Sequence, residues 1–173
     1  AILSFIIVFG IVKAITNYYT GALANKFGRK NLLVTGWIIA IPIPFILMFA
    51  PSWSWIIAAN VLLGINQGLA WSSTVVMKID IVGEKQRGFA MGLNEFAGYI
   101  AVAIVAFLTG WIASEYGIRP YPFYLGIGLV FLGLFGSIFF IKDTRHHVAK
   151  ETISNTIPRL KNIFWDTTWK DKN

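Results

Sequence analysis

Five long apolar runs follow one another along the chain, separated by short polar stretches. They are Ile2–Ala24, Asn31–Ala50, Ser54–Met77, Gly88–Ala113 and Pro122–Ile141. Each reaches the roughly 20 residues that a helix needs to cross about 30 Å of hydrocarbon. Strands of a membrane barrel would instead need about 10 residues of strict alternation, which these runs lack. The pattern predicts an all-α integral membrane protein with five transmembrane helices.

Composition supports this interpretation and divides the chain into two parts. Hydrophobic residues make up 56% and charged residues 13%, against roughly 45–50% and about 25% in soluble domains. We expect a five-helix bundle over residues 1–142 and a polar linker or tail over residues 143–173. Apolar residues between 153 and 164 recur at helical spacing. An amphipathic helix on the inner leaflet and a loosely ordered linker both remain open for this tail.

The basic residues lie mostly in alternate connections, although the net charge is +7. Of the 15 lysines and arginines, all but Lys13 and Arg119 lie in the first connection, the third connection or the tail. Loops on the cytoplasmic side carry such an excess. We therefore expect the Lys26–Lys30 loop, the Lys78–Arg87 loop and the tail on the cytoplasmic side of the plasma (inner) membrane. Because the basic excess reflects topology, nucleic acid is not an expected partner.

Catalytic chemistry has little support in the sequence. The chain has no cysteine, which removes disulfides and thiolate chemistry, and no clustered nucleophile and base point to an enzyme. No cofactor and no metal site are predicted. Five spans with a cytoplasmic tail place the amino terminus outside without a cleavable leader, so we expect further sequence upstream.

A short segment recurs along the chain. Thr20–Arg29 aligns with Thr109–Ile118, 89 residues further on, with identical threonine, alanine and two glycines. The first copy follows the first apolar run and the second copy follows the fourth, so the two turns fall on opposite sides of the membrane. Inverted repeats of three helices would leave this pattern.

Polar side chains inside the spans are concentrated in the first, third and fourth runs, whereas the second and fifth carry no charged residue. A charge within hydrocarbon is costly and usually faces a cavity or a partner. In the third run a polar stripe at helical spacing passes through Gly64 and continues to Thr74 and Lys78. The candidate residues for a substrate or proton site are Lys13, Asn17, Asn60, Gln67, Trp71, Asn94 and Glu95.

Each of these residues also has a structural interpretation. The stripe suits a solute-lined wall, but it equally suits helix packing around Gly64 and Gly68, and buried amides often join helices. Counting ~1.5 Å per residue from the helix ends places Lys13 ~16 Å deep and Glu95 ~10 Å deep. Their long side chains can span that difference. An anion anchor, a Lys13–Glu95 ion pair and hydrogen bonds to neighbouring helices all remain open.

The first connection resembles the loop signature of the major facilitator superfamily, G-x-L-a-D-R-x-G-R-R/K. The matching residues are Gly21, Leu23, Lys26, Gly28, Arg29 and Lys30. The resemblance implies that the chain covers family helices two to six of a secondary transporter. Such a protein moves a small solute by alternating access, coupled to protons or another ion. Its partners would be the substrate, protons, the lipid bilayer, the missing first helix and the carboxy-terminal half.

The chain departs from the signature at several positions. Asn25 stands where the family usually has aspartate, Asn60 stands where its fourth helix usually has arginine, and the fifth helix lacks the antiporter proline. The resemblance implies a partner for Arg29 at the inner end of the fourth family helix, and Asp80 fits that place. We expect this pair to be partly solvated and to contribute about 1 kcal/mol or less. A truncated, non-transporting membrane module with a scaffold role is the alternative function.

Overall fold

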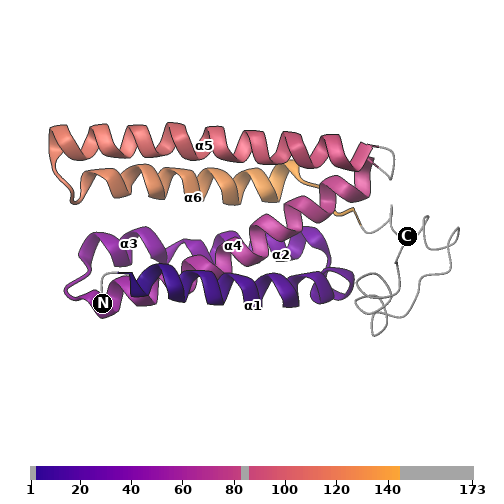
Figure 1. The fold of residues 1–173 in the computed structure, drawn as a ribbon, viewed down its shortest axis with the longest axis horizontal. Helices are drawn as coiled ribbons and strands as arrows, with labels where there is room; N and C mark the ends of the chain where they lie inside the picture. The colour runs from indigo at the N-terminus through magenta and orange to yellow at the C-terminus, as the bar shows by residue number, and fades with distance from the viewer. Residues whose placement is uncertain (1–2, 83–85, 145–173) are drawn as a thin grey trace, which may run out of the picture.

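The computed structural model describes residues 3–82 and 86–144, and this part of the chain is helical, with no strand. The helices lie along one long axis (Figure 1). Their bounds are α1 Ser4–Phe27, α2 Arg29–Ala40, α3 Pro42–Phe49, α4 Trp53–Val82, α5 Arg87–Tyr116 and α6 Tyr121–Phe140. The amphipathic segment expected between residues 153 and 164 lies outside the described residues.

The second predicted span is one rod with a break. Helices α2 and α3 are separated at Ile41, whose N–H donates to Ile38 O at 3.2 Å. Pro42 and Pro44 follow at once, and proline has no N–H to give to the preceding turn. The span Arg29–Phe49 nevertheless has the length and apolarity of a membrane helix, as do α1, α5 and α6.

Helix α4 is not among the helices whose length and apolarity alone identify them as membrane spans. At ~1.5 Å per residue, its 30 residues are long enough to cross a bilayer. It contacts α1, α2, α3 and α5, and it crosses from the α1 layer to the α5 layer (Figure 1). Polar residues such as Asn66 therefore face other helices rather than lipid. The predicted third span is longer than expected, because the helix continues to Val82.

Small residues bring α4 into close contact with α1. A Cβ added at Gly68 would lie 2.5 Å from Thr16 Cβ, and one at Gly64 would lie 2.9 Å from Val12 Cβ. Transmembrane helices commonly associate through small residues at this four-residue spacing. Asn66 Nδ2 also donates to Gly36 O of α2 at 2.9 Å. The packing interpretation of the polar stripe is therefore confirmed for Gly64 and Gly68.

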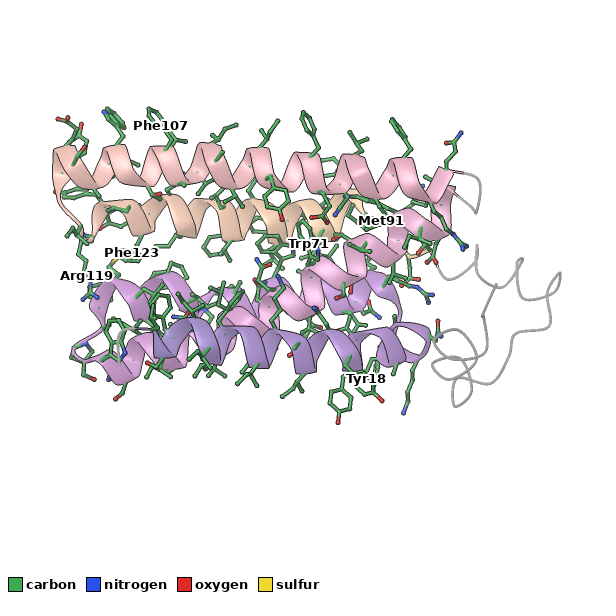
Figure 2. The ribbon with its side chains drawn as sticks, in the orientation of Figure 1. Tyr18, Trp71, Met91, Phe107, Arg119 and Phe123 are labelled. Carbon is green, nitrogen blue, oxygen red and sulfur yellow. The ribbon has the colours of Figure 1, made fainter. Side chains whose placement is uncertain are left out.

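Large apolar side chains cover the outside of the bundle. Tyr18 of α1 is 77% exposed and Phe107 of α5 is 73% exposed, and they point outward on opposite faces (Figure 2). Apolar exposure over whole helices exceeds what a soluble monomer tolerates. A bilayer is the solvent that such a surface requires, so the chain is an integral membrane protein.

The two turns of the sequence repeat have the same backbone geometry. Gly28 has φ 89° and Gly117 has φ 94°, a region that glycine adopts without strain. The Gly28 N–H donates to Ala24 O at 3.1 Å, and the Gly117 N–H donates to Ala113 O at 3.0 Å. The turns lie at opposite ends of the bundle (Figure 1), hereafter the Gly28 end and the Gly117 end. The two turns therefore match in backbone geometry and lie at opposite ends, as the inverted repeat predicted from the sequence requires.

One residue pair extends the repeat beyond the aligned segment. Lys30 and Arg119 each follow their turn glycine by two positions, and each donates to the carboxyl end of another helix. Lys30 Nζ donates to Ile138 O in the last turn of α6 at 2.7 Å. Arg119 donates through a guanidinium nitrogen to Ala50 O at the end of α3 at 3.0 Å. A cation suits these carbonyls because they have no partner within their helix. We call the two contacts the reciprocal cation caps.

Candidate functional site

A polar pocket of about 280 Å³ lies between α1, α4 and α5, and we call it the central pocket. It is lined by Lys13, Gln67, Trp71, Glu95, Gly98, Tyr99 and Val102. Four of these are residues that the sequence singled out. The structure therefore brings the deep lysine of α1 and the deep glutamate of α5 to one space.

Trp71 forms the wall of this pocket between α4 and α5, and it projects into the space between the two helix layers (Figure 2). A Cβ added at Gly98 would lie 2.7 Å from Trp71 Cη2. The indole therefore lies against the α5 backbone, and a side chain at position 98 would require it to move. Gln67, one turn before Trp71, lines the same pocket.

Lys13 and Glu95 share the pocket without forming an ion pair. Lys13 Nζ lies 5.6 Å from the centroid of the Phe9 ring, one turn earlier on α1. An ammonium near an aromatic face is attracted by the negative ring face, a contact worth roughly 0.5–2 kcal/mol. The Lys13–Glu95 ion pair, one of the alternatives that the sequence left open, is thus absent from the described residues, although both side chains open to the same space.

Behind Glu95, a chain of polar contacts joins α5 to α4. Lys78 Nζ donates to Asn94 Oδ1, and Asn94 Nδ2 donates to Glu95 Oε1 at 3.2 Å. The Asn94 side chain is buried, and the residue is 5% exposed. Asn94 therefore reaches the pocket through its neighbour and does not line it.

Two other predicted residues lie outside the central pocket. Asn17 Oδ1 accepts a hydrogen bond from Ser72 Oγ at 2.7 Å, which joins α1 to α4. Asn60 Nδ2 donates to Ile56 O of its own helix at 2.8 Å. In this conformation Asn17 joins two helices, and the part-buried Asn60 bonds only within its own helix.

A larger and mostly apolar pocket opens beside the central one. Its volume is about 830 Å³, its wall comes from all the helices except α1, and we call it the apolar pocket. Gln67 lines both spaces, and Asn66, Trp37 and Thr109 are among the polar groups of the larger one. The bundle therefore offers a charged space next to an apolar one.

The signature residues at the Gly28 end form a second polar cluster around Asp80. Arg29 Nε lies 3.1 Å from Asp80 Oδ2, without the alignment of a hydrogen bond, and an Arg29 guanidinium nitrogen donates to Ala24 O at 3.0 Å. Thr144 Oγ1 donates to the same Asp80 oxygen at 2.7 Å. The predicted pairing is present. The expectation of partial solvation is wrong, because the two side chains are only 5% and 10% exposed.

The rest of the signature has varied surroundings. Lys30 N–H donates to Asp143 Oδ2 at 3.3 Å, in addition to the cap that its side chain makes. Lys26 Nζ lies 5.6 Å from the Phe27 ring centroid. Gly21 and Asn25 are exposed, and a Cβ at Gly21 would meet no atom within 4 Å. These two positions are open to contact from outside the described residues.

Sequence reasoning missed several residues of both clusters. Gly98 and Tyr99 follow Glu95 on α5 by three and four positions, which places them on the same helix face and in the central pocket. Helical spacing could have predicted them. Lys78 continued the polar stripe of α4, but its partner Asn94 could not be inferred from one helix. Thr144 lies beyond the boundary expected at residue 142.

The fold and the pocket define a polytopic α-helical membrane protein with a polar site between its helices. The sequence profile of the Major Facilitator Superfamily matches residues 2–172. The chain belongs to this family of secondary transporters and is not an enzyme.

Three bacterial relatives illustrate the similarity. The chain is 31% identical to the multi-drug resistance efflux pump PmrA of Streptococcus pneumoniae serotype 4, over 76% of this chain and 32% of that protein. It is 28% identical to the multidrug resistance protein MdtG of a Rahnella species, over 84% and 35%. It is 31% identical to the proton-coupled antiporter flippase LtaA of Staphylococcus haemolyticus, over 65% and 26%. The chain thus spans about a third of the length of the first two relatives.

Proposed function

We propose that this chain is part of a permease that moves a small amphipathic solute by alternating access, coupled to protons or another ion. One observation supports this most strongly: Lys13 and Glu95 open into one pocket between helices without pairing there. A charge near the bilayer centre costs at least ~2.5–3.5 kcal/mol unless water, a partner or a ligand compensates it. A solute that binds between the two groups supplies that compensation.

The pocket chemistry favours an amphipathic solute. Lys13 can hold a negative group, while Trp71 and Tyr99 offer flat apolar faces with one polar atom each. The apolar pocket next to it can take the apolar part of such a molecule. Two relatives are named for multidrug resistance, which supports a solute of this kind.

Coupling to protons follows from the same pair of groups. Protonation of Glu95 removes the negative charge that compensates Lys13 in the pocket. Binding of a solute with a negative group restores such a charge, and its departure removes it again. A ligand shifts a two-state equilibrium by as much as its affinities for the two states differ. The LtaA relative is named as proton-coupled, which supports protons as the coupling ion.

The complete transporter needs further helices and a defined orientation. We propose a first helix and a carboxy-terminal half as structural partners, because the chain spans about a third of the length of its first two relatives. We also propose that the Gly28 end faces the cytoplasm of a plasma membrane. That end carries Lys26, Lys30 and Lys78, whereas Arg119 lies at the other end.

The decisive experiment measures solute uptake by the full-length protein in proteoliposomes. Lys13→Met should abolish coupled transport while membrane insertion stays intact, and Glu95→Gln should remove the pH dependence of transport. Lys142→Met is the control, because Lys142 is an exposed lysine outside the central pocket. Wild-type uptake and pH response in Lys13→Met would show that this lysine only packs. Absence of uptake by the wild-type protein would instead favour a non-transporting membrane module.

Orientation has its own test. Single cysteines at positions 25, 83 and 117 can be labelled in intact cells with an impermeant reagent. We expect position 117 to be labelled, and positions 25 and 83 only after the membrane is permeabilised. The reverse labelling pattern would overturn the proposed orientation.

A further inference from the structure

The contact between Lys78 and Asn94 lies outside both the signature cluster and the wall of the central pocket. Lys78 is two turns beyond Trp71 on α4, and its ammonium donates to the Asn94 carbonyl oxygen on α5. On its other side, Lys78 lines a pocket of about 370 Å³ between α4 and the end of α6. Asn94 itself is buried, and a buried amide is destabilising unless its polar atoms are paired. The lysine thus supplies a hydrogen-bond donor for the carbonyl oxygen of the Asn94 amide.

The chemistry of the two groups fixes how Asn94 is oriented. A lysine ammonium has three donors and no acceptor, whereas an amide has one oxygen acceptor and one NH₂ donor group. The Asn94 oxygen must therefore face Lys78, and its NH₂ must face away from it. That NH₂ donates to Glu95 Oε1 at 3.2 Å. The contact can run in one direction only, from Lys78 through Asn94 to Glu95.

We propose that Lys78 and Asn94 are positioning residues for Glu95, which hold its carboxyl group in one orientation at the central pocket. This inference rests on the proposed function of that pocket. The other titratable groups that line the pocket with Glu95 are Lys13 from α1 and Tyr99 from α5. Lys78 does not line the pocket, so it acts on Glu95 through Asn94 alone. Without Lys78 the Asn94 amide is free to turn, and Glu95 loses a directed donor.

A merely structural role for Lys78, joining α4 to α5, makes a different prediction. Loss of a helix contact lowers stability whether residue 95 is glutamate or glutamine. Loss of positioning instead changes the orientation of the Glu95 carboxyl group. Loss of positioning should therefore have no effect in the Glu95→Gln background, where that carboxyl group is absent. The two roles therefore separate in a spectroscopic signal of Glu95 and in a double-mutant cycle.

Infrared absorption of the full-length protein in lipid gives the first test, and it needs no transport. The Glu95 carboxyl band is the band lost in Glu95→Gln. Lys78→Met and Asn94→Leu should each move this band, and Lys78→Arg should leave it in place because arginine keeps the donors. Lys142→Met is the matched control, since Lys142 lines the same α4–α6 pocket as Lys78. If Lys78→Met does not fold, Lys78→Leu and Asn94→Leu replace it. An unmoved Glu95 band in the folded variants would overturn the inference.

Transport gives the second test. Lys78→Met should lower solute uptake about tenfold, which corresponds to an increase of roughly 1.4 kcal/mol in the activation free energy of transport. The same substitution made in Glu95→Gln should lower uptake no further. Equal losses in both backgrounds would overturn positioning in favour of a helix contact. If the wild-type protein moves no solute but the infrared band responds as expected, the proposed function fails while the positioning of Glu95 stands.

Discussion

The two ends of the bundle share one backbone turn but differ in the charges built around it. Each turn has a glycine with positive φ, followed two residues later by a cation that caps another helix. At the Gly28 end Arg29 enters a buried ion pair with Asp80. The equivalent position at the Gly117 end is Ile118, which is 77% exposed. The repeat therefore accounts for the turn and the cap, whereas the ion pair is an addition at one end.

Removal of the Asp80 carboxylate should give the largest difference between the ends. Asp80→Ala leaves the Arg29 guanidinium buried without its counter-charge, and losing one partner of a buried pair typically lowers stability by about 3–5 kcal/mol. Glu115→Ala is the matched control, because Glu115 is an exposed acid near the Gly117 turn, and it should change stability by less than about 0.5 kcal/mol. Reversible unfolding in mixed micelles measures both. Equal effects would show that the ion pair is not what distinguishes the ends.

The same pair allows a coupling test. Arg29→Ala and Asp80→Ala should lower stability and transport to similar extents, and the double variant should be little worse than either. Residues in one ion pair behave non-additively in this way. Fully additive losses would contradict the coupling of the two side chains.

Substitution of the turn glycines should affect both ends alike. Gly28→Ala and Gly117→Ala each force a side chain into a backbone region that costs about 1–3 kcal/mol outside glycine. Gly21→Ala is the control, because that glycine lies within α1 and a Cβ there meets no atom within 4 Å. Unfolding measurements on the three variants would sharpen the comparison. A much larger loss at Gly28 would show that the ion pair depends on the turn.

Thr144→Val should give a smaller loss, confined to the Gly28 end. It removes one hydrogen bond to the Asp80 carboxylate, and hydrogen bonds to charged groups contribute about 1.5 kcal/mol or somewhat more. Thr144→Ser keeps the hydroxyl and should restore most of the stability. If the valine and serine variants unfold alike, the hydroxyl makes no contribution.

The reciprocal cation caps should give the smallest and most symmetric effects. Lys30→Gln and Arg119→Gln should each lower stability by about 0.3–1 kcal/mol, and the losses should shrink in high salt. Because the two caps lie at opposite ends of the bundle, the double variant should show additive losses. Lys26→Gln, which removes a cation from the same loop as Lys30, should change stability less than Lys30→Gln.

Much of the fold could be predicted from the sequence because hydrocarbon imposes a strong pattern. The apolar runs became helices, and the glycine repeat became two matching turns. Helix α4 shows the limit of hydropathy: its polar residues lower the apolar signal, yet packing around Gly64 and Gly68 places them inside the bundle. The end of the helix at Val82 was also missed, since the run of apolar residues stops before it.

The site was partly predictable for a similar reason. Depth along a helix can be counted from the sequence, so Lys13 and Glu95 were expected near one another. Asn17 and Asn60 lie on the same helix faces as Lys13 and Gln67 but at other depths, and they hydrogen bond to Ser72 of α4 and to Ile56 O of α4 instead. Asp80, the partner of Arg29, also accepts a hydrogen bond from Thr144, which lies 64 residues away along the chain. Such long-range contacts leave no local pattern.

The reciprocal cation caps affect how α2–α3 and α6 can move relative to each other. They fasten the α2–α3 rod to the antiparallel α6 rod at both ends, through Lys30 and Arg119. Two bodies held at two points can rotate only about the line that joins those points, and here the line runs along the bundle (Figure 1). Twisting the two rods about this line breaks neither cap, whereas splaying them apart at one end breaks the cap there, at a cost of about 0.3–1 kcal/mol. In the proposed transport cycle, motion of α1, α4 and α5, the helices that contain Lys13, Trp71 and Glu95, would break neither cap.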